Sequence, residues 1–263
     1  MKQRQIAART RSPLLDASQP GTTSQMIDWT PDRSAVIVCD MWDAHHCRDA
    51  ERRVTEMAPR MNHVLGILRS QDALIVHAPS SCMDFYRGTV GRRLADQARH
   101  AKPPAPIDWQ AWNPAREGPL PPELADPGAC SCATAEPCSA AVDADPWTRQ
   151  IATIDIADSD AISDDGQEIF NLLEQRQITD VLVMGVHTNV CVLGRPFGIR
   201  QLVYLGKRPL LCRDLTDSFH RWPAGHAAGT ELIVSHIEAF WCPTVTSDQL
   251  VGGEAFVFDV VAH

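Results

Sequence analysis

A cysteine directly follows a strand-like run in the segment VMGVHTNVCVLG, residues 183–194. The apolar run 180–186 predicts a buried strand, and a helix is expected from about residue 190, so Cys191 would lie where that helix begins. Unpaired N–H groups at a helix start favour a thiolate and can stabilise an oxyanion on an attacked carbonyl. Two interpretations stay open: Cys191 is a nucleophile with a lowered pKa, or it is an inert core thiol.

A carboxylate occupies a comparable place at the end of another strand. Asp40 follows the apolar run AVIVC, residues 35–39. Burying a carboxylate is costly unless it has a partner, and beside Cys191 it would accept the thiol proton and later protonate a leaving amine. The competing interpretation is that Asp40 only caps the next helix.

Alternating strand and helix patterns indicate how these residues are positioned. They predict an α/β fold of three layers, α/β/α, doubly wound around a mainly parallel sheet. Ligands bind at the carboxyl ends of the strands in such sheets. The polar residues expected to converge there are Asp40, His77, Asp155, Asp158, Asp160 and the segment from His187 to Cys191. The expected strands cover 35–39, 73–80, 151–156, 180–186 and 209–215, and the expected helices cover 48–70, 164–176, a segment from about 190, and 229–240.

The 263 residues fit one large domain at 31–250, with a loose N-terminal arm at 1–30 and a C-terminal tail at 251–263. A Pro-rich insertion interrupts the domain at about 84–150. It carries Cys130, Cys132 and Cys138, whose spacing lacks a C-x-x-C pair; a metal site, a disulfide and a plain surface insertion are the alternatives. Nine cysteines is an odd number, which excludes a fully paired disulfide framework.

Charge and hydropathy limit the partners. A net charge of −9 argues against nucleic acid and anionic membranes, and no apolar run approaches the roughly 20 residues that span a bilayer. We therefore expect a soluble cytoplasmic protein without polyanionic partners.

Two segments carry a family resemblance. VIVCDMWDAHHC, residues 36–47, and GVHTNVCVLGRPFGIRQL, residues 185–202, resemble the isochorismatase-like cysteine hydrolases, in particular a nicotinamidase-like subgroup. The resemblance covers about 35–245 apart from the insertion. It implies hydrolysis of the C–N bond of a small amide through a thioester, an Asp-Lys-Cys triad, and homo-oligomers. It also implies a cis peptide before His187, with the N–H groups of His187 and Cys191 forming an oxyanion hole.

The sequence departs from the family at the lysine. The chain contains only Lys2, Lys102 and Lys207, and none lies on the third strand, where acidic residues stand instead. Arg149 is the candidate for the missing positive charge, although arginine cannot pass on a proton.

The resemblance further implies a divalent metal such as zinc, held by aspartate and histidine beside the triad. Asp43, His45 and His77 are the candidate ligands, with His46 and Asp84 as neighbours. The alternative is that these histidines only line the cleft. Two other functions stay open: an isochorismatase-type hydrolase of a different bond, and a catalytically silent binding or scaffold protein that lacks the family lysine.

Overall fold

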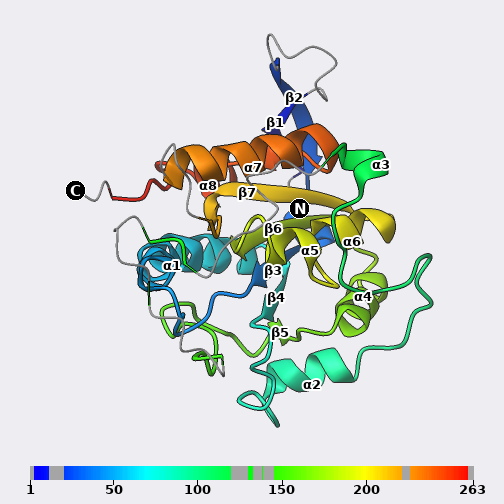
Figure 1. Cartoon of the computed structure of the whole chain (residues 1–263). Helices are drawn as coiled ribbons and strands as arrows, with labels where there is room; N and C mark the ends of the chain where they lie inside the picture. Colours follow the sequence, from blue (N-terminus) through cyan, green and yellow to red (C-terminus); the bar gives the residue numbers. More distant parts are fainter. Residues whose placement is uncertain are drawn as a thin grey trace.

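The computed structural model describes residues 3–11, 21–119, 130–132, 138, 145–220 and 226–259. One eight-stranded sheet organises them, in the order β2-β1-β8-β7-β6-β3-β4-β5, with β2 and β1 at the top of Figure 1 and β5 near the bottom. The strands are β1 Arg4–Arg11, β2 Thr22–Trp29, β3 Ser34–Cys39, β4 Leu74–Ala78, β5 Ala161–Ile162, β6 Asp180–Val186, β7 Arg208–Asp217 and β8 Thr244–Val245. The helices are η1 Pro31–Arg33, α1 Arg48–Arg69, α2 Val90–Asp96, α3 Pro114–Glu117, α4 Gly166–Gln175, α5 Cys191–Gly194, α6 Ile199–Tyr204, α7 His226–Phe240 and α8 Ser247–Val251.

The predicted three-layer α/β/α architecture is confirmed. The strands from β3 to β8 pair in parallel, whereas β1 pairs antiparallel with both β2 and β8. Alternate residues of β3 enter two separate cores: Ala35 and Ile37 pack with α4, α6 and α7, whereas Val36 and Val38 pack with α1 and α8. Strands buried on both faces explain the continuous apolar runs in the sequence.

The expectation of a loose arm at 1–30 is wrong for residues 4–11 and 22–29, which form two strands. β1 and β2 form a hairpin that continues the sheet. Ile6 and Ala8 alternate into the core, while Arg9 and Arg11 form ion pairs with Glu238 of α7. A period of two in RQIAARTR is the physical reason for a strand here.

The expectation of a strand at 151–156 is also wrong. These residues turn instead: the Ile151 N–H donates to Met41 O, and the Ile154 N–H donates to Ile151 O. The third strand of the expected order is the short β5, which pairs with β4 through Ala161 and Ile162. Local hydrogen bonds to the chain after β3 therefore override the apolar pattern.

Among the described residues, no helix combines the length and apolarity needed to cross a bilayer.

The described parts of the insertion pack closely against the domain. Arg92 of α2 forms an ion pair with Glu168 of α4. Glu117 of α3 is buried and accepts hydrogen bonds from Arg200 at 2.7 Å, His236 at 2.7 Å and the Trp241 indole at 2.8 Å. Burial alone would raise the pKa of Glu117, but hydrogen bonds from His236 and Arg200 outweigh it and lower the pKa to about 2.

Glu117 therefore predicts a pH-dependent contribution to stability. Because its pKa is lower in the folded chain, the stabilisation is present above the ordinary value of 4.5 and is lost as the pH falls toward about 2. We expect Glu117→Gln to lower the free energy of unfolding at pH 7 by about 1–3 kcal/mol. Chemical denaturation of both proteins at pH 7 and pH 3 measures this, and a difference that grows toward pH 3 would contradict the prediction.

Candidate active site

Two adjacent parallel strands, β3 and β6, end at the candidate active site. Asp40 follows β3 with a left-handed φ of 49°, and His187 follows β6 after a cis peptide bond from Val186, as the resemblance implies. Gly185 lets the strands approach closely: its φ is 114°, and a Cβ there would lie 2.0 Å from the Cys39 carbonyl oxygen. Asp40 and Cys191 therefore come from distant parts of the sequence to one point.

Asp40 is completely buried, and each of its carboxylate oxygens accepts a hydrogen bond. Its Oδ1 accepts a hydrogen bond from the Ser80 N–H at 2.8 Å, and its Oδ2 accepts one from Arg195 Nε at 3.0 Å. Burial raises the pKa of Asp40 above its usual range, although the Arg195 charge and the Ser80 hydrogen bonds oppose that rise. Asp40 does not cap the next helix, because Cys47 is the N-cap residue of α1.

Cys191 begins α5 and interacts with the carboxylate of Asp40 and with the His187 N–H. The expectation of a lowered thiol pKa is wrong. Burial raises the pKa of Cys191, and the negative charge of Asp40 raises it further. Only 6% of the residue is exposed, and α5 is four residues long, so the helix N-terminus compensates little. The raised pKa therefore favours the thiol form of Cys191.

The cation at this site is Arg195, which the sequence analysis missed. Its guanidinium binds Asp40, and its Cζ lies 5.7 Å from the ring centroid of Trp109 in the insertion. Burial works against its charge, but Asp40 and the neighbouring thiol keep its pKa above the ordinary arginine value. The signal was available: Arg195 follows Cys191 by four residues, which is one helical turn. Arg149 lies elsewhere and forms an ion pair with Asp43 at 3.7 Å.

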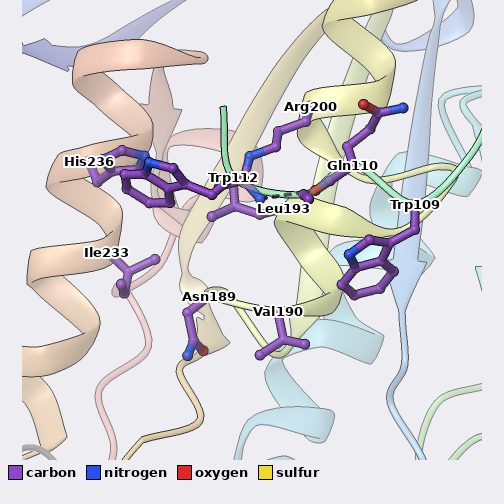
Figure 2. A pocket seen from close by; sticks show the side chains of 10 residues that line it. Trp109, Gln110, Trp112, Asn189, Val190, Leu193, Arg200, Ile233 and His236 are labelled. Carbon is purple, nitrogen blue, oxygen red and sulfur yellow. Dashed lines mark hydrogen bonds between the residues drawn. The ribbon is translucent and has the colours of Figure 1, made fainter. Parts of the chain in front are cut away.

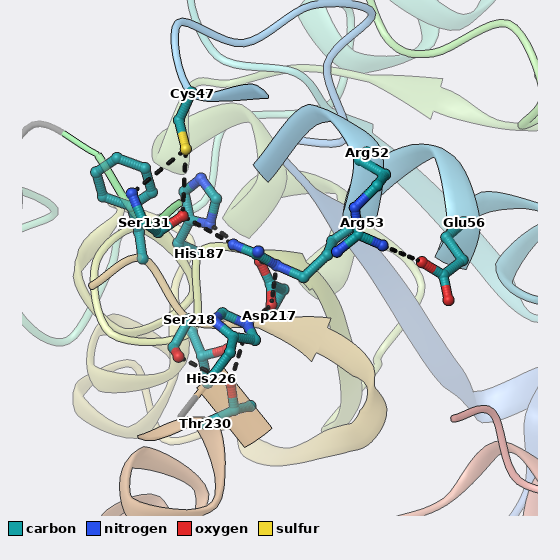
Figure 3. A network of polar contacts seen from close by, with 12 residues as sticks. Cys47, Arg52, Arg53, Glu56, Ser131, His187, Asp217, Ser218, His226 and Thr230 are labelled. Atoms are coloured by element: carbon teal, nitrogen blue, oxygen red, sulfur yellow. Dashed lines mark hydrogen bonds and ion pairs between the residues drawn. The ribbon is translucent and has the colours of Figure 1, made fainter. Parts of the chain in front are cut away.

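His187 connects the candidate site to a second buried network, which Figure 3 shows. Its Nε2 is 3.1 Å from His45 Nε2, and its Nδ1 is 3.9 Å from Asp217 Oδ2. Burial lowers the pKa of His187 to about 4, so the ring is neutral at pH 7. Arg53 of α1 donates to both oxygens of Asp217 at 3.0 Å. Sequence patterns gave no signal for this pair, since its members are 164 residues apart.

The residues expected to bind a metal are not brought together. His77 is buried between Gln150 and Asp160, with ring nitrogen distances of 3.0 and 3.1 Å. Asp43 accepts hydrogen bonds from the Thr148 N–H and hydroxyl at 2.9 and 2.8 Å. His45 instead contacts His187. Hydrogen-bond partners thus occupy these side chains, and the set Asp43, His45 and His77 does not fit a metal beside the triad.

A cavity of about 270 Å³ lies next to the segment that carries Cys191. Figure 2 shows it between α7 and the insertion, with Asn189, Val190 and Leu193 on one side and Trp109 and Trp112 around it. Neither Asp40 nor Cys191 is part of its lining. Trp42, which follows β3, stacks on Trp147 of the insertion at 4.1 Å between ring centroids. The insertion thus supplies Trp109 and Trp112 to the cavity and Trp147 to the stack with Trp42.

The fold has counterparts among solved structures. A cysteine hydrolase from Pseudomonas syringae pv. phaseolicola matches with a TM-score of 0.51 and 16% identity, over 84% of this chain and 93% of that protein. An isochorismatase family protein from Burkholderia thailandensis matches with a TM-score of 0.46 and 13% identity, over 83% of this chain and 93% of that protein. No protein-family model and no curated protein matches the chain. The first match shows that the chain has the fold of a cysteine hydrolase.

Proposed function

We propose that this protein is a cysteine hydrolase that cleaves the C–N bond of a small amide, nicotinamide-like in kind, through a thioester. The observation that carries the proposal is the meeting of Cys191, Asp40 and Arg195 at the ends of two neighbouring strands. The family resemblance of residues 36–47 and 185–202 and the shared fold support the same class of reaction.

Asp40 is the only base that this chemistry needs. As Cys191 Sγ attacks the amide carbonyl, its proton passes to Asp40, and the tetrahedral intermediate collapses when Asp40 protonates the departing nitrogen. A water molecule then adds to the thioester, gives one proton to Asp40, and releases the acid while the proton returns to the sulfur. The N–H groups of His187 and Cys191 are the candidate oxyanion donors.

Arg195 takes the electrostatic role of the family lysine without its acid-base role. An arginine side chain stays protonated, so it cannot move protons during turnover. Its charge instead lowers the pKa of the buried Asp40, which burial raises, and so favours the ionised form that acts as a base. The missing lysine is therefore compatible with activity.

Covalent trapping tests the proposal. We expect small aromatic amides to release ammonia, and an aldehyde analogue such as pyridine-3-carbaldehyde to add reversibly to Cys191 as a thiohemiacetal. Because this adduct is reversible, its position is found from the cysteine that the aldehyde protects against alkylation, which peptide mass spectrometry identifies among the nine. Ammonia release without any Cys191 adduct would contradict the thioester route. Hydrolysis of a vinyl ether or an ester, with no ammonia release and no Cys191 adduct, would favour an isochorismatase-type hydrolase. Neither hydrolysis nor adduct would leave a catalytically silent binding protein.

The raised pKa of Asp40 predicts the pH dependence. Because Asp40 must be ionised to accept the thiol proton, kcat/KM should rise with pH through the Asp40 pKa. The acid limb should therefore lie above the ordinary aspartate value of about 3.9. A rate profile from pH 3 to 9 checks this, and an acid limb below pH 4 would contradict the assignment of Asp40 as base.

We further propose that the protein works in the cytoplasm as a homo-oligomer, with a small-molecule substrate and without nucleic-acid or membrane partners. The net charge of −9 and the family resemblance support this. Light scattering after size-exclusion chromatography tests the oligomer, and a monomer at micromolar concentration would refute it.

A further inference from the structure

Four cysteines meet where the insertion touches the start of α1. Cys47 Sγ lies 3.8 Å from Cys130 Sγ and 3.6 Å from Cys132 Sγ, and Cys132 Sγ lies 3.4 Å from Cys138 Sγ. All four sulfur atoms are within 4.8 Å of one another, and all four cysteines are free. In the described part of the chain, this is the one group of three or more possible metal ligands.

We propose that Cys47, Cys130, Cys132 and Cys138 together bind one zinc ion as four thiolates. Zinc binds cysteine sulfur at about 2.3 Å, and a tetrahedron with that radius has sulfur atoms about 3.8 Å apart. The three sulfur separations, 3.4–3.8 Å, are close to that edge length. Four thiolates without oxygen or nitrogen ligands suit zinc rather than magnesium, calcium or manganese.

Backbone amides surround the sulfur atoms and support thiolates. The Ser131 N–H donates to Cys47 Sγ at 3.3 Å, the Cys132 N–H to Cys130 Sγ at 3.3 Å, and the Arg48 N–H to Cys138 Sγ at 3.4 Å. Such donors orient metal ligands and stabilise their negative charge. Cys47 is also the N-cap of the 22-residue α1, where the helix dipole favours an anion.

The site would be structural rather than catalytic. Four protein ligands complete a tetrahedral zinc shell and leave no open position for substrate. Cys47 and Cys132 are 0% and 2% exposed, whereas Cys130 and Cys138 are partly exposed, so two of the four ligands are shielded from solvent. Cys47 precedes Cys130 by 83 residues, which means that the ion would fasten the insertion to α1.

This fastening leads directly to the candidate active site. Ser131, between two of the ligands, accepts a hydrogen bond from Arg53 at 2.8 Å, and Arg53 in turn holds Asp217 beside His187 (Figure 3). Zinc would therefore fix the position of Ser131 and, through Arg53, the buried network behind His187. This inference does not depend on the hydrolase proposal.

Metal content of the purified full chain tests the site. Elemental mass spectrometry should find one zinc per chain after exhaustive desalting, and an organomercurial should release one equivalent. Exchange with Co²⁺ should give the intense sulfur-to-cobalt charge-transfer absorption of a tetrahedral tetrathiolate. Iron in place of zinc, no metal at all, or disulfides among the four cysteines would overturn the proposal.

Variants locate the ion. Cys132→Ser should lower the bound zinc at least tenfold and change the Co²⁺ spectrum, whereas Cys242→Ala, which removes a buried thiol outside the cluster, should keep one zinc. If Cys132→Ser does not fold, zinc-dependent protection of the four cysteines from alkylation in the unmodified chain gives the answer. Zinc that survives Cys132→Ser but is lost in His77→Ala would place the metal elsewhere and refute the inference.

Discussion

Cys191→Ala should lower kcat/KM for the amide substrate by on the order of 10⁴-fold or more, because in the proposed mechanism it removes the atom that forms the thioester. What remains would be catalysis by the oxyanion donors and by binding alone. Initial-rate measurements of ammonia release give the ratio. Thermal unfolding must show that the variant is folded, since a Cys-to-Ala change at a buried position also removes packing.

The matched control is Cys242→Ala, which deletes another buried thiol away from Asp40. It should keep its kcat/KM within about twofold of the unmodified chain, because the substitution changes packing around residue 242 and leaves Cys191, Asp40 and Arg195 in place. Equal losses in both variants would assign the effect to packing, and activity that survives in Cys191→Ala would exclude the thioester route.

Arg195→Met should produce the second large effect, because it leaves the buried Asp40 carboxylate without its cation. Removing one partner of a buried ion pair costs about 3–5 kcal/mol of unfolding free energy. Arg195 is 26% exposed, which places the expected loss toward the lower end. Since Arg195 lowers the Asp40 pKa, its removal should raise that pKa further, and Asp40 will hold its proton at higher pH.

Two measurements separate these consequences. The stability loss should shrink as the pH falls, because a protonated Asp40 no longer needs a cation, and denaturation at pH 5 and pH 8 measures this. The acid limb of the rate profile should move to higher pH. Arg195→Lys keeps the positive charge and is the control that should retain most of both properties. An unchanged acid limb in Arg195→Met would mean that Arg195 does not set the charge of Asp40.

The strands that carry the candidate site were predictable from the sequence. A strand buried on both faces needs an uninterrupted apolar run, and 35–39 and 180–186 have one, so β3 and β6 matched almost to the residue. Because parallel strands end at a common edge, the convergence of Asp40 and Cys191 followed from the same pattern. The acidity of the Cys191 thiol did not follow, since it depends on burial and on the distance to Asp40.

Other features depend on contacts that no local pattern contains. Cys47 appeared to stand alone in the sequence, and only the folded chain brings it to Cys130 and Cys132. The expected strand at 151–156 has the right residues but bonds to the chain after β3 instead. Arg195 was not predicted for a different reason. The resemblance implies a lysine on the third strand, whereas Arg195 lies one helical turn after Cys191.

The position of Arg195 one turn after Cys191 determines which segments of the chain set the geometry of the candidate site. Cys191 and Arg195 lie on one short stretch of backbone. A rigid shift of that stretch would therefore change the distance from Asp40 to the Cys191 sulfur and the distance from Asp40 to the Arg195 guanidinium together. Asp40 takes its cation from Arg195 and not from the segment around Asp160, which contains no lysine. Asp160 there anchors Arg69 and His77, a purely architectural task. Substitutions in the segment around Asp160 should therefore lower stability before they lower turnover.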